Sequence, residues 1–235
     1  MTIWRSLLLV YGGIDVLFQD PSGNSQRFVH VLTEPEVIDG VSSFQQFPSL
    51  VENLTSRRAS VRYDIYQAER SLTSLTQLSE GMYWPSPTDT RPEIDRLAGA
   101  GAYQSIFVLW PQQNLQNGTF IPSAGWGLGM AASDWSNGAT YATVGNTDRW
   151  RWQVPLVGEV WLHEWLHGVC AHFSAQGHHM PDGDADGGGR HGYLQSPISG
   201  WTDYYRDLMT GQVRVAGKAR GMGIPLDAWG EQVVV

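Results

Sequence analysis

Hydrophobic positions in the first 110 residues alternate between strand spacing and helix spacing. Strand patterns occupy 6–18, 27–32 and 60–66, and the segments with helical spacing or helix-start signals are 48–58, 69–78 and 92–100. The most apolar run, Ser105–Trp110, is rich in bulky residues and ends at a proline, which predicts a buried central strand. This alternation predicts a mixed, mostly parallel sheet with helices packed on it.

The longest helical pattern covers 155–176. Pro155 suits its first turn and Gly177 suits its C-terminal cap. Its apolar positions form one core stripe at helical spacing: Leu162, Leu166, Val169 and Phe173. Before this helix, 125–129 predicts a loop packed by Trp126. The next segment, 138–144, predicts a short strand, which is either the edge strand that the family resemblance described below implies or a strand covered on both sides.

The helix at 155–176 also carries the pattern His-Glu-x-x-His, as His163, Glu164 and His167. Residues four apart lie on one face of a helix, so both imidazoles can bind one metal ion, with the glutamate beside it. The flanking residues are uncharged and mostly bulky, which predicts burial, and unpaired buried polar groups are costly. We therefore expect a metal site rather than two ordinary histidines and a solvated glutamate.

Residues 160–169 resemble the extended zinc-binding signature of the zincin metallopeptidases, and a looser similarity extends over 103–211. The resemblance implies that His163 and His167 bind zinc and that Glu164 is the general base in hydrolysis of a peptide or protein substrate. It also implies a zincin-like α+β fold, in which an edge strand of the mixed sheet lies beside the long zinc-binding helix.

Two parts of one catalytic domain follow from this interpretation. Residues 1–177 would form a sheet and helix part that ends in the zinc-binding helix, and 178–235 would form a small, loop-rich C-terminal part. The chain is long enough to bury a substantial core in one domain.

The third zinc ligand does not follow the pattern of either large zincin group. Metzincins place a histidine six residues after the second ligand, where this chain has Phe173, and the preceding glycine of that pattern is replaced by Cys170. Gluzincins use a downstream glutamate, but the chain has no glutamate between Trp165 and Gly230. The subfamily chemistry of these groups therefore cannot be transferred.

The path of the chain after His167 limits which residues can be the third zinc ligand. A helix that continues to 176 carries the chain about 13 Å past His167 at ~1.5 Å per residue. An extended return at ~3.3 Å per residue takes about four residues, which places the ligand at or beyond Pro181. Asp184 and His191 rank first and about level, followed by Asp186. If the helix instead breaks at Gly168, two further candidates return: His178 and His179.

The acidic residues of this loop allow a second metal as well. Asp182, Asp184, Asp186 and the following glycine resemble the first half of a calcium loop. The twelfth position of such a loop is Tyr193 rather than glutamate, so the match is incomplete. Calcium is therefore a candidate cofactor besides zinc, and a solvated acidic turn is the alternative.

Three further observations concern the surroundings of the site. Met209 resembles the methionine that lies beneath the metal in metzincins, with a plain core residue as the alternative. A tyrosine could stabilise an oxyanion, and the sequence does not choose among Tyr193, Tyr204 and Tyr205. Cys170 is the single cysteine, so internal disulfides are excluded, and we interpret it as a small buried apolar residue rather than a nucleophile or ligand.

Composition and charge restrict the partners. The net charge of −8 argues against a nucleic-acid partner, and no basic run suggests a membrane surface. Charged residues make up only 16%, with 27 glycines, 11 tryptophans and one cysteine, a composition that resembles secreted bacterial enzymes. We expect a secreted protein whose signal peptide has been removed, since 7–10 is too short and interrupted to be one. Oligomeric state stays open.

The sequence thus predicts a zinc metalloprotease, with two alternatives. One is a non-peptidase zinc hydrolase that acts on a glycan or an amide, which the many tryptophans would suit. The other is a non-catalytic binding module that zinc stabilises.

Overall fold

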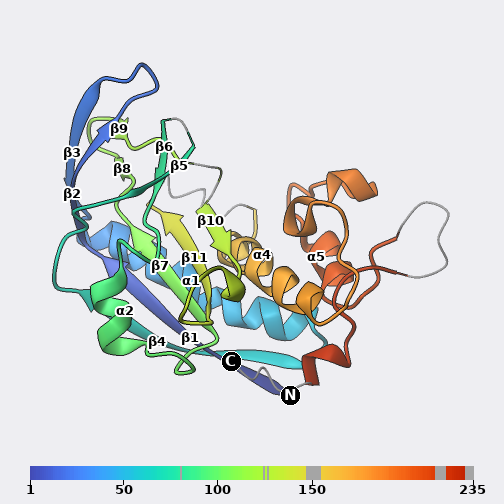
Figure 1. Ribbon diagram of the computed structural model, residues 1–235. Coiled ribbons are helices and arrows are strands. Elements are labelled where there is room, and N and C mark those ends of the chain that lie inside the picture. The colour runs from blue at the N-terminus through green and yellow to red at the C-terminus, as the bar shows by residue number, and fades with distance from the viewer. Residues whose placement is uncertain (80, 124, 126, 147–154, 215–220, 231–235) are drawn as a thin grey trace.

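A five-stranded sheet forms the centre of the computed structural model, which describes residues 1–79, 81–123, 125, 127–146, 155–214 and 221–230 (Figure 1). Its strands are, in spatial order, β10 (Gly127–Met130), β11 (Thr140–Gly145), β7 (Ser105–Trp110), β1 (Thr2–Tyr11) and β4 (Ala59–Ala68). β10 is antiparallel to its neighbour, and all other pairs are parallel. The predicted mixed α/β architecture with a mostly parallel central sheet is therefore confirmed.

The most apolar run of the sequence is the middle strand of this sheet. All six residues of β7 are buried, and β1 and β11 pair with it on either side. A strand covered on both faces needs apolar side chains in both directions, which explains the unbroken apolar run.

Helices cover both faces of the sheet. On one face, alternate β1 residues such as Leu8 pack in one core with α1 (Glu34–Leu54) and α4 (Glu159–Ala175). On the other face, residues such as Leu7 share a second core with α2 (Arg91–Leu97). This division follows from the period of two in a strand. Among the described helices, none combines the length and the apolar character that a membrane crossing requires.

Three small hairpins gather at one end of the central sheet (Figure 1). They are β2 (Gly13–Gln19) with β3 (Ser25–Val31), β5 (Thr76–Ser79) with β6 (Met82–Trp84), and β8 (Gln113–Asn114) with β9 (Thr119–Phe120).

The C-terminal residues pack against α4 through α5 (Thr202–Leu208) and short 3-10 turns. The Trp229 ring stacks on Trp165 with centroids 6.1 Å apart, and its indole N–H donates to the carbonyl of Met209 at 2.9 Å. The segments on either side of position 177 therefore share one hydrophobic core.

Two helix predictions in the N-terminal half were wrong. The helix expected at 48–58 begins 14 residues earlier, at Glu34, because Thr33 and Glu36 form a capping box there. Pro48 lies inside this helix rather than at its start. The helix expected at 69–78 is absent: Leu72 instead bridges Ile14, and β5 begins at position 76.

The edge strand was also predicted in the wrong place. The segment 138–144 forms β11, which is covered by β7 and β10, while the edge strand β10 lies in the stretch predicted as a loop. Glycines allow β10 to lie directly against α4, since a Cβ at Gly129 would stand 2.2 Å from the carbonyl oxygen of Glu164. Glycine inside a strand marks such close approach of another backbone. Trp126, expected to pack this segment, lies outside the described residues.

The close contact between β10 and α4 gives a stability prediction. Gly129→Ala should lower the free energy of unfolding by about 2 kcal/mol or more, because the added methyl group meets backbone that cannot yield without moving the strand. Urea unfolding followed by circular dichroism measures this. Gly99→Ala is the matched control, since nothing lies within 4 Å of its added Cβ, and it should change stability by less than about 0.5 kcal/mol. Equal stability of both variants would contradict the contact.

α4 begins later than predicted and ends as predicted. It starts at Glu159 rather than at 155, because Gly158 precedes it in the left-handed region with φ +91°. It continues past Gly168 to Ala175, and Gly177 follows with φ +93°, as expected for a C-terminal cap. The predicted core stripe is buried throughout: Leu162, Leu166, Val169 and Phe173.

Candidate metal centre

The half-buried imidazoles of His163 and His167 lie one helical turn apart on one face of α4. Their ring centroids are 4.9 Å apart. The 3-10 turn η2 (Asp184–Asp186) packs against this helix. Asp186 in that turn has its Oδ1 3.4 Å from His163 Nε2 and its Oδ2 3.9 Å from His167 Nε2. One ligand atom of each of these three residues lies within 4.8 Å of the other two.

The structure thus separates the candidates for a third ligand. Asp186, ranked third from the sequence, joins the two histidines. Asp184 lies on the other side of the His167 ring, with its Oδ1 2.7 Å from Nδ1. His191, which follows in the turn η3 (Gly189–His191), is outside the group that converges among the described residues, as are His178 and His179.

The turn that carries Asp186 is held by unusual backbone and by a tyrosine. Gly183 and Asp184 have φ values of +82° and +37°, and positive φ outside glycine is uncommon although aspartate tolerates it better than most residues. The Tyr204 hydroxyl donates to the carbonyl of Asp184. A Cβ at Gly187 would lie 2.5 Å from that same hydroxyl. Backbone strain of this kind is typical of functional sites, where the surrounding structure compensates for it.

Each imidazole has a partner at the ring nitrogen that faces away from the group. His163 Nδ1 lies 2.8 Å from the Tyr205 hydroxyl, and His167 Nδ1 lies 2.7 Å from the Asp184 carboxylate. Such contacts fix the ring orientation of metal-binding histidines. Burial lowers the pKa of His167, but the hydrogen bond and the charge of Asp184 outweigh it, so the pKa is raised above its ordinary value.

Glu164 is buried between α4 and the edge strand. Its side chain is 3% exposed, and its Cδ would stand 3.1 Å from a Cβ at Gly127 of β10. Burial raises the pKa of this carboxyl to about 7, although the two neighbouring histidines act in the opposite direction. A cation held by those histidines would favour the ionised carboxylate.

The other residues singled out from the sequence are engaged elsewhere. The Tyr193 hydroxyl donates to Asp207 at 2.5 Å, and those of Tyr204 and Tyr205 bond Asp184 and His163, so all three have partners within the protein. Cys170 is buried, and burial raises the pKa of its thiol well above its ordinary value, which confirms the interpretation as a small core residue. Met209 is buried at the end of α5.

The aspartates of the loop do not converge on a common point of their own. Asp184 contacts Nδ1 of His167 while Asp186 faces Nε2 of both histidines, and Asp182 is outside the group formed by the described residues. Calcium binding here stays a prediction without a cage of convergent oxygen atoms to support it.

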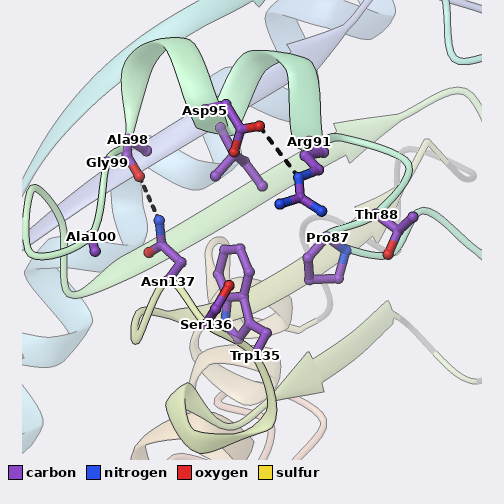
Figure 2. Close-up of a pocket in the computed structure, with 11 residues that line it drawn as sticks. Pro87, Thr88, Arg91, Asp95, Ala98, Gly99, Ala100, Trp135, Ser136 and Asn137 are labelled. Atoms are coloured by element: carbon purple, nitrogen blue, oxygen red, sulfur yellow. Dashed lines mark hydrogen bonds and ion pairs between the residues drawn. The ribbon is translucent and has the colours of Figure 1, made fainter.

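A separate hollow of about 460 Å³ lies beside α2, on the opposite face of the sheet. Figure 2 shows the Trp135 ring and the Arg91 guanidinium at this hollow, with Arg91 bonded to Asp95 and Asn137 bonded to the carbonyl of Ala98. The residues around it include no member of the histidine and aspartate group, so its chemistry is independent of that group.

The donor atoms of the group fit zinc. Two imidazole nitrogens and one carboxylate oxygen form a ligand set that zinc accepts in catalytic sites, where three protein ligands leave one position open. Both imidazoles have the outer hydrogen-bond partner that such ligands require. The spacing in the sequence signalled the two histidines, but nothing in the sequence signalled that Tyr205 and Asp184 contact the outer nitrogens of their rings.

No family model, curated protein or solved structure matches the chain.

Proposed function

We propose that this chain is a zinc-dependent metalloprotease with a zincin-like arrangement of helix and edge strand. One observation carries the proposal. One ligand atom each of His163, His167 and Asp186 lies within 4.8 Å of the others, beside the buried carboxyl of Glu164. A metal at that point would have three protein ligands and a general base as its neighbour.

The position of the edge strand supports a peptide as the substrate. β10 pairs with β11 on one side and is the last strand of the sheet, and it packs on α4 next to Glu164. Extended peptides bind to such strands by backbone hydrogen bonds that continue the sheet. A peptide bound along β10 would pass the metal group with its backbone in a defined orientation.

The residues of the group then have distinct roles. Zinc held there would supply Lewis acidity toward the scissile carbonyl and water. His163, His167 and Asp186 hold it. Glu164 removes a proton from the attacking water and returns it to the leaving amine.

The first alternative, a hydrolase of glycans or small amides, has less support from the tryptophans than their number suggests. Five of them are almost completely buried in the core and have no surface for stacking on a sugar: Trp4, Trp110, Trp161, Trp165 and Trp229. The peptide interpretation is therefore preferred.

A direct assay tests the proposal. Zinc-loaded protein should cleave a reduced and alkylated polypeptide, and mass spectrometry should detect new amino termini. A chelator should stop the cleavage and added zinc should restore it, whereas calcium should not. Absence of new termini at full zinc occupancy, or cleavage that the chelator leaves unchanged, would exclude a zinc protease.

A further inference from the structure

The two histidines of the metal group are held by chemically different partners. The Asp184 carboxylate can only accept a hydrogen bond, so it requires the proton of His167 to be on Nδ1 and leaves Nε2 with a free lone pair. The Tyr205 hydroxyl can donate or accept, so its 2.8 Å contact with His163 Nδ1 is compatible with either tautomer.

The tautomer of His163 decides whether it can bind metal. If Tyr205 donates to Nδ1, the ring proton is on Nε2, where it faces Asp186 Oδ1 at 3.4 Å. If His163 donates from Nδ1 to Tyr205, the lone pair of the ring is on Nε2, the nitrogen that faces Asp186. In that second arrangement the phenol proton can no longer point at His163 and needs another acceptor, because an unpaired buried hydroxyl is costly.

Glu159 is the candidate for that acceptor. It lies one helical turn before His163 and is 1% exposed. Its Oε1 accepts the backbone N–H of Trp201 at 2.6 Å, while Oε2 is buried and has no hydrogen-bond partner. A Cβ at Gly200, which has φ +55°, would lie 1.9 Å from Oε2, so the carboxylate is packed where only glycine allows it.

The electrostatics agree with this placement. After burial, the charge of Glu159 is the largest contribution that raises the pKa of Tyr205. Burial raises the pKa of Glu159 to about 7, and a hydrogen bond from a phenol would offset that effect. Glu159 and His163 are one helical turn apart on α4, and their partners Trp201 and Tyr205 are one turn apart at α5, which places the Glu159 carboxylate beside the His163–Tyr205 contact.

We propose that Tyr205 is a positioning residue whose hydroxyl donates a hydrogen bond to His163 in the metal-free protein and accepts one from His163 when metal binds. In the metal-bound state the hydroxyl donates its own hydrogen bond to Glu159 Oε2. The inference rests on the proposed zinc site, because it assumes that Nε2 binds the metal. The number of protons on the imidazole is unchanged: one leaves Nε2 for solvent and one is taken up from solvent at Nδ1. His167, held by a carboxylate, keeps its proton on Nδ1 in both states.

Nitrogen-15 NMR of the histidine side chains tests the tautomers directly. In metal-free protein, His163 should carry its proton on Nε2 and His167 on Nδ1, and zinc should move only the former. If His163 already carries its proton on Nδ1 without metal, the inference is wrong. This readout is independent of whether zinc binds, so it separates the inference from the proposed function, which fails if the wild-type chain binds no zinc.

Zinc titration of variants tests the coupling. Tyr205→Phe should weaken zinc binding about 10–100-fold, the usual effect of losing an outer hydrogen-bond partner. Tyr193→Phe is the matched control, because it removes a tyrosine hydroxyl bonded to Asp207, and it should bind zinc like the wild type. Glu159→Gln should weaken binding about 10-fold, because an amide N–H directed at the phenol oxygen favours the wrong tautomer.

The double variant provides the decisive comparison. Tyr205→Phe combined with Glu159→Gln should bind zinc as tightly as Tyr205→Phe alone, within about twofold, because Glu159 acts through the phenol. Additive losses would show that Glu159 acts independently and would overturn the pair. Wild-type zinc affinity in Tyr205→Phe would overturn the role of the tyrosine, and circular dichroism of each variant confirms that it is folded.

Discussion

Asp186→Ala should reduce zinc affinity by several orders of magnitude, whereas Asp184→Ala should reduce it only about 10–100-fold. The difference follows from their positions. Asp186 faces Nε2 of both histidines at 3.4 and 3.9 Å, while Asp184 contacts the far nitrogen of His167. An apparent zinc-binding free energy of ~10–16 kcal/mol divided among three ligands is roughly 3–5 kcal/mol for each. At ~1.4 kcal/mol per factor of ten, that is a loss of roughly 10²–10⁴.

The measurement is zinc titration against a competing chelator of known affinity. His163→Ala and His167→Ala should match the large loss, and His191→Ala is the control, since it is outside the convergent group. A ligand that binds only the native state raises the melting temperature. Zinc should therefore raise that of the wild type and of His191→Ala, which bind it, but not that of Asp186→Ala, which has lost a ligand. If the largest loss maps to Asp184 or His191, Asp186 is not the third ligand.

The two histidines and the loop that faces them could be predicted from the sequence, whereas the position of Asp186 within that loop could not. Spacing put His163 and His167 on one face of a helix, and the chain path past His167 pointed to the loop that carries Asp186. Which residue of the loop lies nearest to both histidines could not be predicted. It depends on a 3-10 turn begun by positive φ values at Gly183 and Asp184, and on the distant Tyr204 that bonds the turn.

The strands of the sheet also differ in whether their own sequence or their packing against distant segments determines them. β7 was predictable because the five consecutive apolar residues 106–110 indicate burial on both faces. The edge strand β10 was not, because two of its four residues are glycines, which disfavour a strand and leave only Leu128 and Met130 to indicate it. The need for these glycines is evident only in the folded structure, where the backbone of α4 and the side chain of Glu164 occupy the space that their Cβ atoms would fill.

Glu164→Gln should keep zinc and the fold but lose hydrolysis of the polypeptide substrate by about 10²–10⁴-fold, the usual contribution of a general acid–base group. Glutamine has the same shape, and Glu164 is adjacent to the metal group without belonging to it. Glu69→Gln is the matched control, because it makes the same change at an exposed glutamate outside the site, and it should hydrolyse like the wild type. Hydrolysis by Glu164→Gln at the wild-type rate would exclude the general-base role. A non-catalytic binding module, by contrast, would keep its binding function in this variant.

The same substitution should stabilise the metal-free protein at alkaline pH. Burial raises the pKa of Glu164 to about 7 from an ordinary 4.5, so the folded state holds a proton that the unfolded state has lost between these values. Stability of the metal-free wild type should therefore fall as the pH rises from about 4.5 to about 7, because the carboxylate must ionise while buried. Glutamine cannot ionise, so urea unfolding of Glu164→Gln should show a smaller fall, in which the contribution of the buried Glu159 remains. Equal pH dependence in both proteins would mean that the Glu164 carboxyl is not held in a desolvated position by α4 and β10.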